Sequence, residues 1–380
     1  MKILIDCTQI PLEKTGMGIY AINLISEIHS SDETNMYYIL IQDDDDEFRF
    51  ITKSNFILKQ IKSGIFRRLF LRFLLEQLYI PYFILKNSIE IIHSLHYSFP
   101  LLPLPAKKIV TIPDLTFFKY PQYHVKIKVG YFRLFIRLAA FLADTIITIS
   151  QSSKTDFLNM FNVNKDKIAV TYLGTTCHRD LLDDEESSCV KEKFSIKNEY
   201  ILYLGTIEPR KNIKNLIAAF EKITQSGYDG YLVIAGKKGW DVEDVFGFAE
   251  RVGLKNKIIF TGYVYDNEKA HLIKGAKIFV YPSIYEGFGI PVLEALALGV
   301  PTITSNVSSL PEVAGDAALL VDPSNINELF LSMRKLLNNR MLYKNFQERS
   351  LAQAKKFSWE ITAKETIKVY NSWNTKKMNN

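Results

Sequence analysis

The sequence predicts an α/β protein built from two doubly wound parallel sheets, each in its own domain. Strand-like and helix-like segments alternate from end to end, which is typical of parallel sheets joined by crossover helices. At 380 residues the chain exceeds the length at which a single core usually stops growing. A polar stretch, Cys177–Ser188, also divides the chain near its middle, and we interpret it as a linker between the two domains.

We expect six strands on each side of this stretch. The first set is Lys2–Asp6, Tyr37–Gln42, Ile89–His93, Lys108–Pro113, Thr145–Ser150 and Ala169–Leu173. The second set is Tyr200–Gly205, Tyr231–Ala235, Ile258–Thr261, Ile278–Tyr281, Thr302–Thr304 and Ala318–Leu320. The predicted organisation is therefore a domain at residues 1–176, a linker at 177–190, a second domain at 191–355 and a terminal helix at 356–380.

Composition excludes several classes of protein. Hydrophobic residues make up 47% and charged residues 23% of the chain, as is usual for soluble globular proteins. Three scattered cysteines are too few for a disulfide framework or a zinc site, and they fit a reducing cytoplasm. We see no secretory signal and no run of about 18 uncharged apolar residues, so a membrane span is not expected.

Basic residues gather in the N-terminal half, although the net charge of +6 is modest. Several of them alternate with Phe and Leu, which predicts amphipathic helices with a cationic face. Such helices suit an anionic lipid surface, and ordinary half-buried helices are the alternative. Nucleic acid is not expected as a partner, since no nucleic-acid-binding module accompanies the charge. The clustered residues are Lys53, Lys59, Lys62, Arg67, Arg68, Arg72, Lys119, Lys126, Lys128, Arg133 and Arg137.

The most informative segment is KIFVYPSIYEGFGIPVLEALALGVPTITS, which starts at Lys277. It predicts a strand, a glycine-bearing loop, a helix from Pro291 to a cap at Gly299, and a second strand. Glu286 falls on the loop at the strand's carboxyl end, and Glu294 in the first turn of the helix. Ligands bind at this edge of doubly wound sheets, and a helix start suits a phosphate. We therefore expect both carboxylates to contact hydroxyls of a phosphate-bearing ligand.

A second charged group follows the strand at Tyr200–Gly205. The segment TIEPRKN leads into a helix with regular apolar spacing, and Asn212 stands at its N-cap position. Arg210 and Lys211 therefore lie at a strand's carboxyl end beside a helix start. A guanidinium binds a diphosphate through paired hydrogen bonds and an ammonium binds it as a point charge, so we expect a diphosphate here. Two exposed surface charges are the alternative.

Two further candidates lie near the amino terminus. Gly16 and Gly18 follow the first strand and open a helix, so the backbone can approach a ligand closely there, unless they only make a tight turn. A lone G-x-G does not indicate NAD. Asp114 follows another strand, again at its carboxyl end.

Three histidines also fall in this half of the chain. The spacing of His93, His96 and His124 assigns them to no site, so we expect structural roles for them.

These motifs resemble those of the family 4 retaining glycosyltransferases, which have the GT-B fold. The hallmark of that family is a Glu, seven residues and a second Glu, with EGFG before a proline-led helix, as in Glu286–Glu294. The segments Ser305–Pro323, Tyr203–Phe220 and Ala143–Phe157 are also similar, and the likeness covers most of the chain. It is greatest to bacterial enzymes that build lipopolysaccharide or capsule, often mannosyl- or rhamnosyltransferases.

The resemblance implies two Rossmann-like domains that face a deep cleft. The first would bind the acceptor, the second would bind the nucleotide sugar, and the terminal helix would cross back to the first. Catalytic contributions are implied for Glu286, Arg210, Lys211 and Asp114. Donor contacts are implied, or suggested by position, for Gly16, Gly18, Gly205, Thr206, Tyr263, Gly287, Phe288, Gly289, Ile290 and Glu294.

The chain departs from the family pattern at two positions. Many members carry an Arg after the strand-end glycine, where Thr206 stands here, so we expect Arg210 to supply that charge. Relatives often read His-Asp-Leu where this chain reads Pro113-Asp114-Leu115, which removes an imidazole from the expected site.

The implied reaction moves a hexose, mannose or similar, from a nucleotide diphosphate sugar to a saccharide or lipid-linked acceptor, with retention. No cofactor and no metal are expected, because cations can hold the diphosphate and no Asp-x-Asp motif is placed for a metal. We favour same-face attack, since no nucleophile is identified.

The alternatives are an inactive binding or assembly subunit, which Pro113 would favour, and a hydrolysing epimerase, which lacks the EGFG-to-Glu pattern. The expected location is the cytoplasm, either free or peripherally attached to the inner face of the cytoplasmic membrane.

Overall fold

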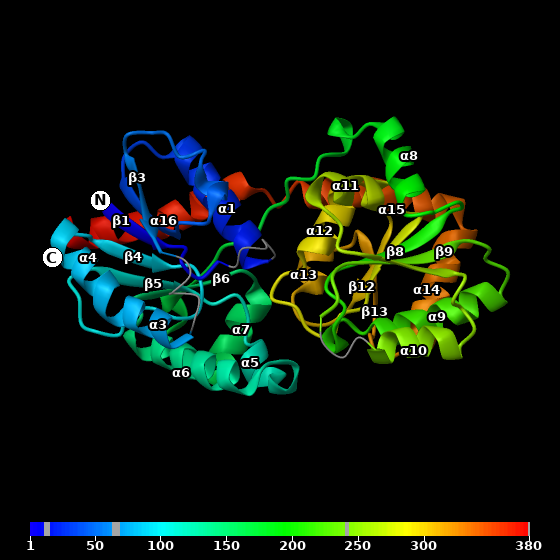
Figure 1. The fold of residues 1–380 in the computed structure, drawn as a ribbon, viewed down its shortest axis with the longest axis horizontal. Helices are drawn as coiled ribbons and strands as arrows, with labels where there is room; N and C mark the ends of the chain where they lie inside the picture. The colour runs from blue at the N-terminus through cyan, green and yellow to red at the C-terminus, as the bar shows by residue number, and fades with distance from the viewer. Residues whose placement is uncertain (11–15, 63–68, 240–242, 379–380) are drawn as a thin grey trace. The chain divides into compact units, whose positions relative to one another are not determined.

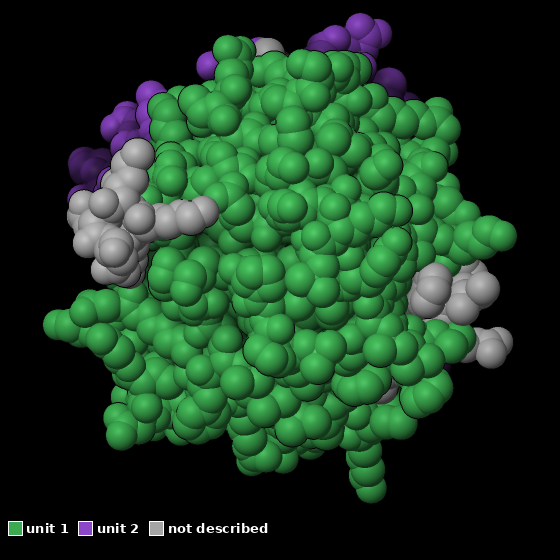
Figure 2. All heavy atoms as spheres, turned by 90° about the vertical axis from the view of Figure 1, so that its left-hand side faces the viewer, with its two compact units in different colours: residues 1–174, 359–380 green, residues 175–358 purple. Residues whose placement is uncertain are grey.

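The computed structural model describes residues 1–10, 16–62, 69–239 and 243–378. The chain forms two compact units, one of residues 1–174 with 359–380 and one of residues 175–358 (Figure 2). We call them unit 1 and unit 2. The predicted class, two doubly wound α/β domains with parallel sheets, is confirmed.

Unit 1 contains a seven-stranded parallel sheet in the order β3-β2-β1-β4-β5-β6-β7. Its central strands β1 and β4 are almost entirely buried, and Asp6 pairs in register with Ser94 where the two strands end. The strands are β1 (Lys2–Asp6), β2 (Met36–Gln42), β3 (Phe56–Ile61), β4 (Ile91–Ser94), β5 (Lys107–Thr111), β6 (Thr145–Thr148) and β7 (Ile168–Val170).

Helices cover both faces of this sheet (Figure 1). Leu4, Leu40 and Ile92 of the sheet pack with helix α4, whereas Tyr37 and His93 point to the other face and contact Tyr370 of the terminal helix α16. Helix α16 also packs against α1. The helices are α1 (Met17–Ser31), α3 (Leu69–Leu74), a π-helical turn η2 (Leu75–Tyr79), α4 (Ile80–Asn87), α5 (Thr116–Lys119), α6 (Lys126–Leu142), α7 (Gln151–Met160) and α16 (Trp359–Met378).

Unit 2 contains a six-stranded parallel sheet in the order β10-β9-β8-β11-β12-β13. Its strands are β8 (Tyr200–Leu204), β9 (Tyr231–Ala235), β10 (Ile258–Gly262), β11 (Ile278–Tyr281), β12 (Thr302–Ser305) and β13 (Ala318–Val321). Its helices are α8 (Asp184–Lys193), α9 (Ile213–Gln225), α10 (Glu243–Arg251), α11 (Asp266–Lys274), α12 (Ile290–Ala297), α13 (Leu310–Ala314), α14 (Ile326–Asn338) and α15 (Arg340–Ala354), with a 3-10 turn η6 (Pro209–Lys211) before α9.

The structure differs from the sequence-based expectation in two places. Strand β3 was not predicted, because its exposed Lys59 and Gln60 interrupt the apolar run at the edge of the sheet. The stretch 177–190, expected as a linker, lies in unit 2 and contains most of helix α8, whose polar composition reflects a solvent-exposed helix.

None of the helices in the described part of the chain combines the length and the apolar composition that a membrane span needs. Of the basic residues singled out in the sequence, Arg67 and Arg68 lie outside the described part of the chain.

Candidate functional site

The charged residues predicted in unit 2 lie where the direction of strand order reverses. The chain runs outward from β8 to β9 and β10 and then returns to β11 on the other side of β8. The loops after β8 and β11 therefore lead away from each other, toward opposite halves of the sheet. Ligands bind at the crevice that such a switch point leaves in open α/β sheets. Lys211 follows β8 and Glu286 follows β11, and the structure brings their side chains into contact.

Glu286 is the centre of this cluster. Lys211 Nζ and Ser283 Oγ each donate to Glu286 Oε1 at 2.6 Å. Tyr281 OH donates to the same oxygen at 3.1 Å, and Arg210 Nη1 lies 3.1 Å from Oε2. Lys211 and Glu286 are 7% and 9% exposed, so the ion pair is largely shielded from solvent. We call Arg210, Lys211, Tyr281, Ser283 and Glu286 the charged cluster.

The charges shift the pKa values of the cluster. Burial would raise the pKa of Glu286, but the Arg210 and Lys211 cations outweigh burial and lower it to about 2. Burial and the neighbouring Arg210 guanidinium lower the pKa of Lys211. Glu286 is therefore a carboxylate at neutral pH, ready to accept hydrogen bonds from hydroxyl groups.

Arg210 links the two loops. Its Nη2 lies 2.7 Å from Glu208 Oε1, and its Nη1 also donates to the Tyr285 carbonyl. The backbone repeats the connection, since Ile284 N donates to the Arg210 carbonyl at 2.9 Å. These contacts fix the guanidinium beside the carboxylate, so the cation is positioned before any ligand binds.

Gly289 is the N-cap residue of helix α12, at the edge of this cluster. Its φ of +114° is disfavoured for residues with a side chain, and a Cβ there would lie 2.8 Å from Leu310 Cδ2. Ser309 Oγ donates to the carbonyls of Glu286 and Phe288, and this shared hydrogen bond fixes the backbone on both sides of Gly287. Pro291 has no N–H, and the N–H groups of Val292 and Leu293 already bond the Gly289 carbonyl, so Ile290 carries the N–H that this helix start can offer a ligand.

Glu294 is held separately, by a lysine from helix α11. Lys269 Nζ lies 2.7 Å from Glu294 Oε1, and Glu294 is 5% exposed. Burial would lower the pKa of Lys269, but the Glu294 carboxylate outweighs burial and raises it. The helix begins one residue earlier than predicted, at Ile290, so Glu294 is its fifth residue. The predicted left-handed cap is confirmed, with Gly299 at φ +68°.

The other predicted positions in unit 2 lie around the same sheet edge. Gly205 N pairs with the Ala235 carbonyl at 2.8 Å, and the Thr206 carbonyl accepts from Tyr203 OH at 3.2 Å. Tyr263 follows the outermost strand β10, two strands from β8, and is 44% exposed.

The N-cap predicted at Asn212 is not made by its side chain. Asn212 does precede α9, but its φ is +60° and its amide donates to the Pro323 carbonyl at 2.6 Å. The side chain therefore ties α9 to the loop after β13 instead of capping the helix.

The predicted residues of unit 1 lie at the carboxyl edge of its own sheet. Gly16 precedes α1 with φ +47°, and Gly18 is buried in the first turn, while the preceding residues 11–15 are outside the described part. Asp114 Oδ1 accepts from Thr116 N and from Tyr97 OH, each at 2.9 Å. Asp114 thus orders the turn into α5 and positions Tyr97.

Sequence reasoning missed three side chains that complete the site in unit 2. Tyr281 and Ser283 bind the Glu286 carboxylate, and Lys269 binds Glu294. Ser283 lies three residues before Glu286, so its proximity could have been inferred from the loop. Lys269 lies on a different helix, and no local pattern connects it to Glu294.

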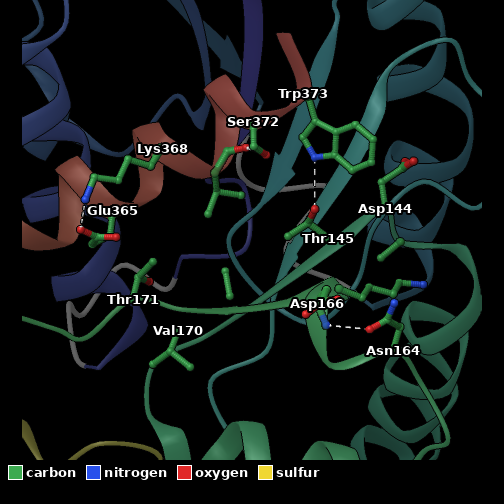
Figure 3. Close-up of a pocket in the computed structure, with 14 residues that line it drawn as sticks. Asp144, Thr145, Asn164, Asp166, Val170, Thr171, Glu365, Lys368, Ser372 and Trp373 are labelled. Carbon is green, nitrogen blue, oxygen red and sulfur yellow. Dashed lines mark hydrogen bonds and ion pairs between the residues drawn. The ribbon is translucent and has the colours of Figure 1, made fainter. Parts of the chain in front are cut away.

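Unit 1 also has a surface pocket of about 480 Å³ (Figure 3). Trp373 of α16 donates to Thr145 Oγ1 at 3.1 Å on its wall, and Asn164 Oδ1 accepts from Asp166 N nearby. The pocket contains none of the predicted site residues. Within the described ranges, no group of three His, Cys, Asp or Glu residues is arranged to hold a metal ion.

Two family profiles match consecutive parts of the sequence. The profile described as Glycosyltransferase Family 4 matches residues 15–179, and the profile described as Glycosyl transferases group 1 matches residues 184–353. The two matches together span most of both units.

Individual relatives and solved structures agree with these matches. O-antigen chain mannosyltransferase B of Escherichia coli is 36% identical over 281 residues, which are 72% of this chain and 73% of that protein. Serotype-specific mannosyltransferase WbdA of Escherichia coli is 35% identical over 226 residues, 58% of this chain but only 28% of WbdA. The crystal structure of HepE from Anabaena in complex with UDP and glucose superimposes with a TM-score of 0.77 at 16% identity, covering 98% of this chain and 100% of HepE.

Proposed function

Because this chain belongs to the family 4, group 1 glycosyltransferases with the GT-B fold, we propose that it transfers a hexose from a nucleotide diphosphate sugar to a sugar hydroxyl. The charged cluster at the switch point of unit 2 carries this proposal. It combines two fixed cations, a carboxylate with a low pKa and a helix amino end within one sheet edge. A diphosphate bound to a polyhydroxylated group matches these charges.

In the proposed mechanism the donor diphosphate displaces Glu286 from its two cations. Arg210 and Lys211 then pair with phosphate oxygens, and the Ile290 N–H at the start of α12 adds a backbone donor. The freed Glu286 carboxylate accepts hydrogen bonds from hydroxyls of the transferred sugar. As the glycosidic bond breaks, negative charge grows on the leaving diphosphate, and these cations stabilise it without requiring a divalent ion.

Glu294 is proposed to bind the ribose of the donor. Its carboxyl group can accept hydrogen bonds from two neighbouring hydroxyls; burial raises its pKa, and the Lys269 ammonium opposes that rise and orients the group. We propose that transfer retains the anomeric configuration by same-face attack, with the donor phosphate accepting the proton of the attacking hydroxyl. Tyr263, as an exposed ring, is the proposed neighbour of the base.

For the sugar and its acceptor we propose mannose and a saccharide or lipid-linked acceptor in cell-surface polysaccharide synthesis. This part of the proposal is supported by the names of the relatives, two of which are O-antigen or serotype-specific mannosyltransferases. We further propose that the enzyme works in the cytoplasm, at the inner face of the membrane.

The proposed membrane contact uses one face of unit 1. Ile127, Leu134 and Phe141 recur every seven residues along α6, and all three are exposed. Residues of η2 and α4 present a second exposed apolar stripe. Tyr131 of α6 donates to Glu76 of η2, so α6 and η2 are neighbours in the helical layer of unit 1 (Figure 1). Exposed apolar stripes flanked by cations suit an anionic bilayer. The second stripe is Leu78, Tyr82 and Leu85, and the flanking cations are Lys86, Lys126, Lys128 and Arg137.

A donor screen tests the proposed reaction. The purified chain is incubated with GDP-mannose and other nucleotide sugars, with and without a saccharide acceptor and a chelator, and nucleoside diphosphate release is measured. We expect acceptor-dependent release that survives the chelator. Donor binding without release under any combination would instead support an inactive binding subunit.

Vesicle flotation tests the membrane contact separately. We expect the chain to bind phosphatidylglycerol vesicles at low salt and to lose this binding in the Leu134→Glu, Phe141→Glu double variant. Leu331→Glu is the control, since Leu331 is equally exposed but lies on α14 of unit 2. Equal binding by both variants would contradict the assignment of this face.

A further inference from the structure

Unit 1 has its own switch point, between β1 and β4, and a polar network lies there. The chain runs from β1 outward to β2 and β3 and returns to β4 on the other side of β1. Gln9 follows β1, while His96 and Ser98 follow β4. Glu76, from the π-helical turn η2, reaches the same place, and π-helical turns are frequent at functional sites. We call Gln9, Glu76, His96 and Ser98 the polar network.

The network fixes the orientation of the Gln9 amide. Its Nε2 lies 2.8 Å from Ser98 Oγ, 3.0 Å from Glu76 Oε1, 3.2 Å from the Ser98 carbonyl and 3.4 Å from the His96 carbonyl. All four partners are oxygens that accept from it: carbonyls can only accept, Ser98 Oγ gives its own hydrogen to Glu76 Oε1 at 2.7 Å, and Glu76 Oε1 also receives Arg72 Nε at 2.9 Å. The NH₂ group therefore points to Glu76, and the amide oxygen must point the other way.

The amide in turn fixes the tautomer of His96. Gln9 Oε1 lies 2.8 Å from His96 Nδ1, and an amide oxygen can only accept, so Nδ1 carries the hydrogen. Burial, together with the charges of Arg72 and Lys128, lowers the pKa of His96 to about 3, so the ring is neutral at physiological pH. Nε2 is then an unprotonated hydrogen-bond acceptor.

The ring is held in place but Nε2 remains available. Tyr97 and Phe132 contact the imidazole edge to face, with ring centroids 4.5 Å and 5.3 Å away. His96 is partly exposed, and in the described part of the chain no group hydrogen-bonds its Nε2. An acceptor atom on a ring that Gln9, Tyr97 and Phe132 hold in place, and that is left open, is pre-organised for a hydroxyl donor.

The surrounding atoms favour the same class of ligand. Asp6 and Ser94 pair in register at the ends of β1 and β4, and Asp6 Oδ2 and Ser94 Oγ are buried without a partner in the described structure. Such atoms are uncommon in folded proteins and call for a specific reason. An unprotonated nitrogen has no hydrogen to donate to a phosphate oxygen, whereas it can accept a hydrogen bond from the O–H group of a saccharide.

We propose that His96 Nε2 accepts a hydrogen bond from a saccharide hydroxyl, at a binding site that Gln9 and Glu76 orient. This inference rests on the proposed transferase function for its biological meaning. In this proposal His96, which follows β4, supplies the imidazole that the family pattern places at Pro113, which follows β5. The hydroxyl belongs either to the transferred hexose or to the acceptor saccharide.

Kinetics of His96→Phe distinguish the two sources. Phenylalanine keeps the ring packing against Tyr97 and Phe132 but removes the acceptor nitrogen. We expect a ten- to hundredfold loss of kcat/KM for one substrate. If kcat/KM for the acceptor falls while the rate of donor hydrolysis is unchanged, the hydroxyl belongs to the acceptor. If the rate of donor hydrolysis falls as well, the hydroxyl belongs to the donor. His29→Phe is the control, because His29 Nε2 only accepts backbone N–H groups.

Nitrogen NMR of the histidine rings tests the site without any turnover. In ¹⁵N-histidine-labelled protein we expect His96, identified by its loss in His96→Phe, to be the Nδ1–H tautomer. We also expect the Nε2 signal to move on titration with methyl α-mannoside, methyl α-glucoside or methyl α-galactoside. Finding the Nε2–H tautomer would overturn the proposal. So would an Nε2 signal that stays in place with all three glycosides, if the kinetics of His96→Phe are also unchanged. A failed donor screen with a moving Nε2 signal would reject only the proposed reaction.

Discussion

The two switch points of the molecule share a topology but differ in charge. In unit 2, the ends of β8 and β11 bring two cations and a carboxylate together. In unit 1, the ends of β1 and β4 bring together an amide, a neutral imidazole and a carboxyl group already bonded to other side chains. The sheet decides where a ligand can bind, and the loop side chains decide which ligand it is. Fixed charge suits a diphosphate, and neutral acceptors suit hydroxyls.

The largest effect is expected from removing a cation of the charged cluster in unit 2. Lys211→Ala should lower kcat/KM by about 10³-fold or more, because it removes the charge that we propose stabilises the leaving group in the transition state. Steady-state release of nucleoside diphosphate measures it. Lys222→Ala, at an exposed lysine bonded to Asn327, is the control and should behave as wild type. Equal turnover in both variants would contradict the assigned role.

The second prediction concerns pH and Glu286. Its pKa is lowered from 4.5 to about 2 in the folded protein, so its charge stabilises the fold above pH 4.5. That contribution, about 3 kcal/mol, is lost as the pH falls from 4.5 toward 2. In urea unfolding, the stability difference between wild type and Glu286→Gln should therefore shrink over this window. A difference that is constant with pH would show that Glu286 does not titrate there.

The third prediction addresses unit 1. Glu76→Gln should lower the free energy of unfolding by about 2 kcal/mol, because the shielded Arg72 guanidinium loses its charged partner. Chemical denaturation measures this loss. Glu360→Gln removes an exposed glutamate paired with Lys364 and should cost far less. If the two variants are equally stable, the Arg72–Glu76 pair contributes no more than a surface pair.

The smallest expected effect separates binding from chemistry within unit 2. Lys269→Met should raise the donor KM about tenfold and leave kcat nearly unchanged, since Glu294, the proposed ribose ligand, loses the cation that orients it. Lys255→Met, at an exposed lysine on the same unit, is the control. A fall in kcat with an unchanged KM would place Lys269 in the chemical step instead.

Sequence reasoning predicted the fold better than the contacts. Lys211 and Glu286 were expected near each other because both follow strands, and parallel strand ends share one edge. Gln9 and His96 are 87 residues apart, and only the placement of β1 beside β4 brings them together. No spacing rule identifies such a pair, so His96 looked like an ordinary structural histidine.

Polar interruptions and side-chain direction also limited the prediction. Strand β3 escaped notice because Lys59 and Gln60 lie on an exposed edge. Asn212 occupies the predicted position before α9, yet its side chain bonds the Pro323 carbonyl, a partner 111 residues away. Local propensity cannot choose between a near partner and a distant one.

The return of α16 to unit 1 has a consequence for biosynthesis. Unit 2 is one continuous stretch, residues 175–358, and can fold as soon as the ribosome has released it. Unit 1 must wait, because Tyr370 of α16 bonds His93 in the centre of the first sheet and is itself fully buried. The domain translated first is therefore the one completed last.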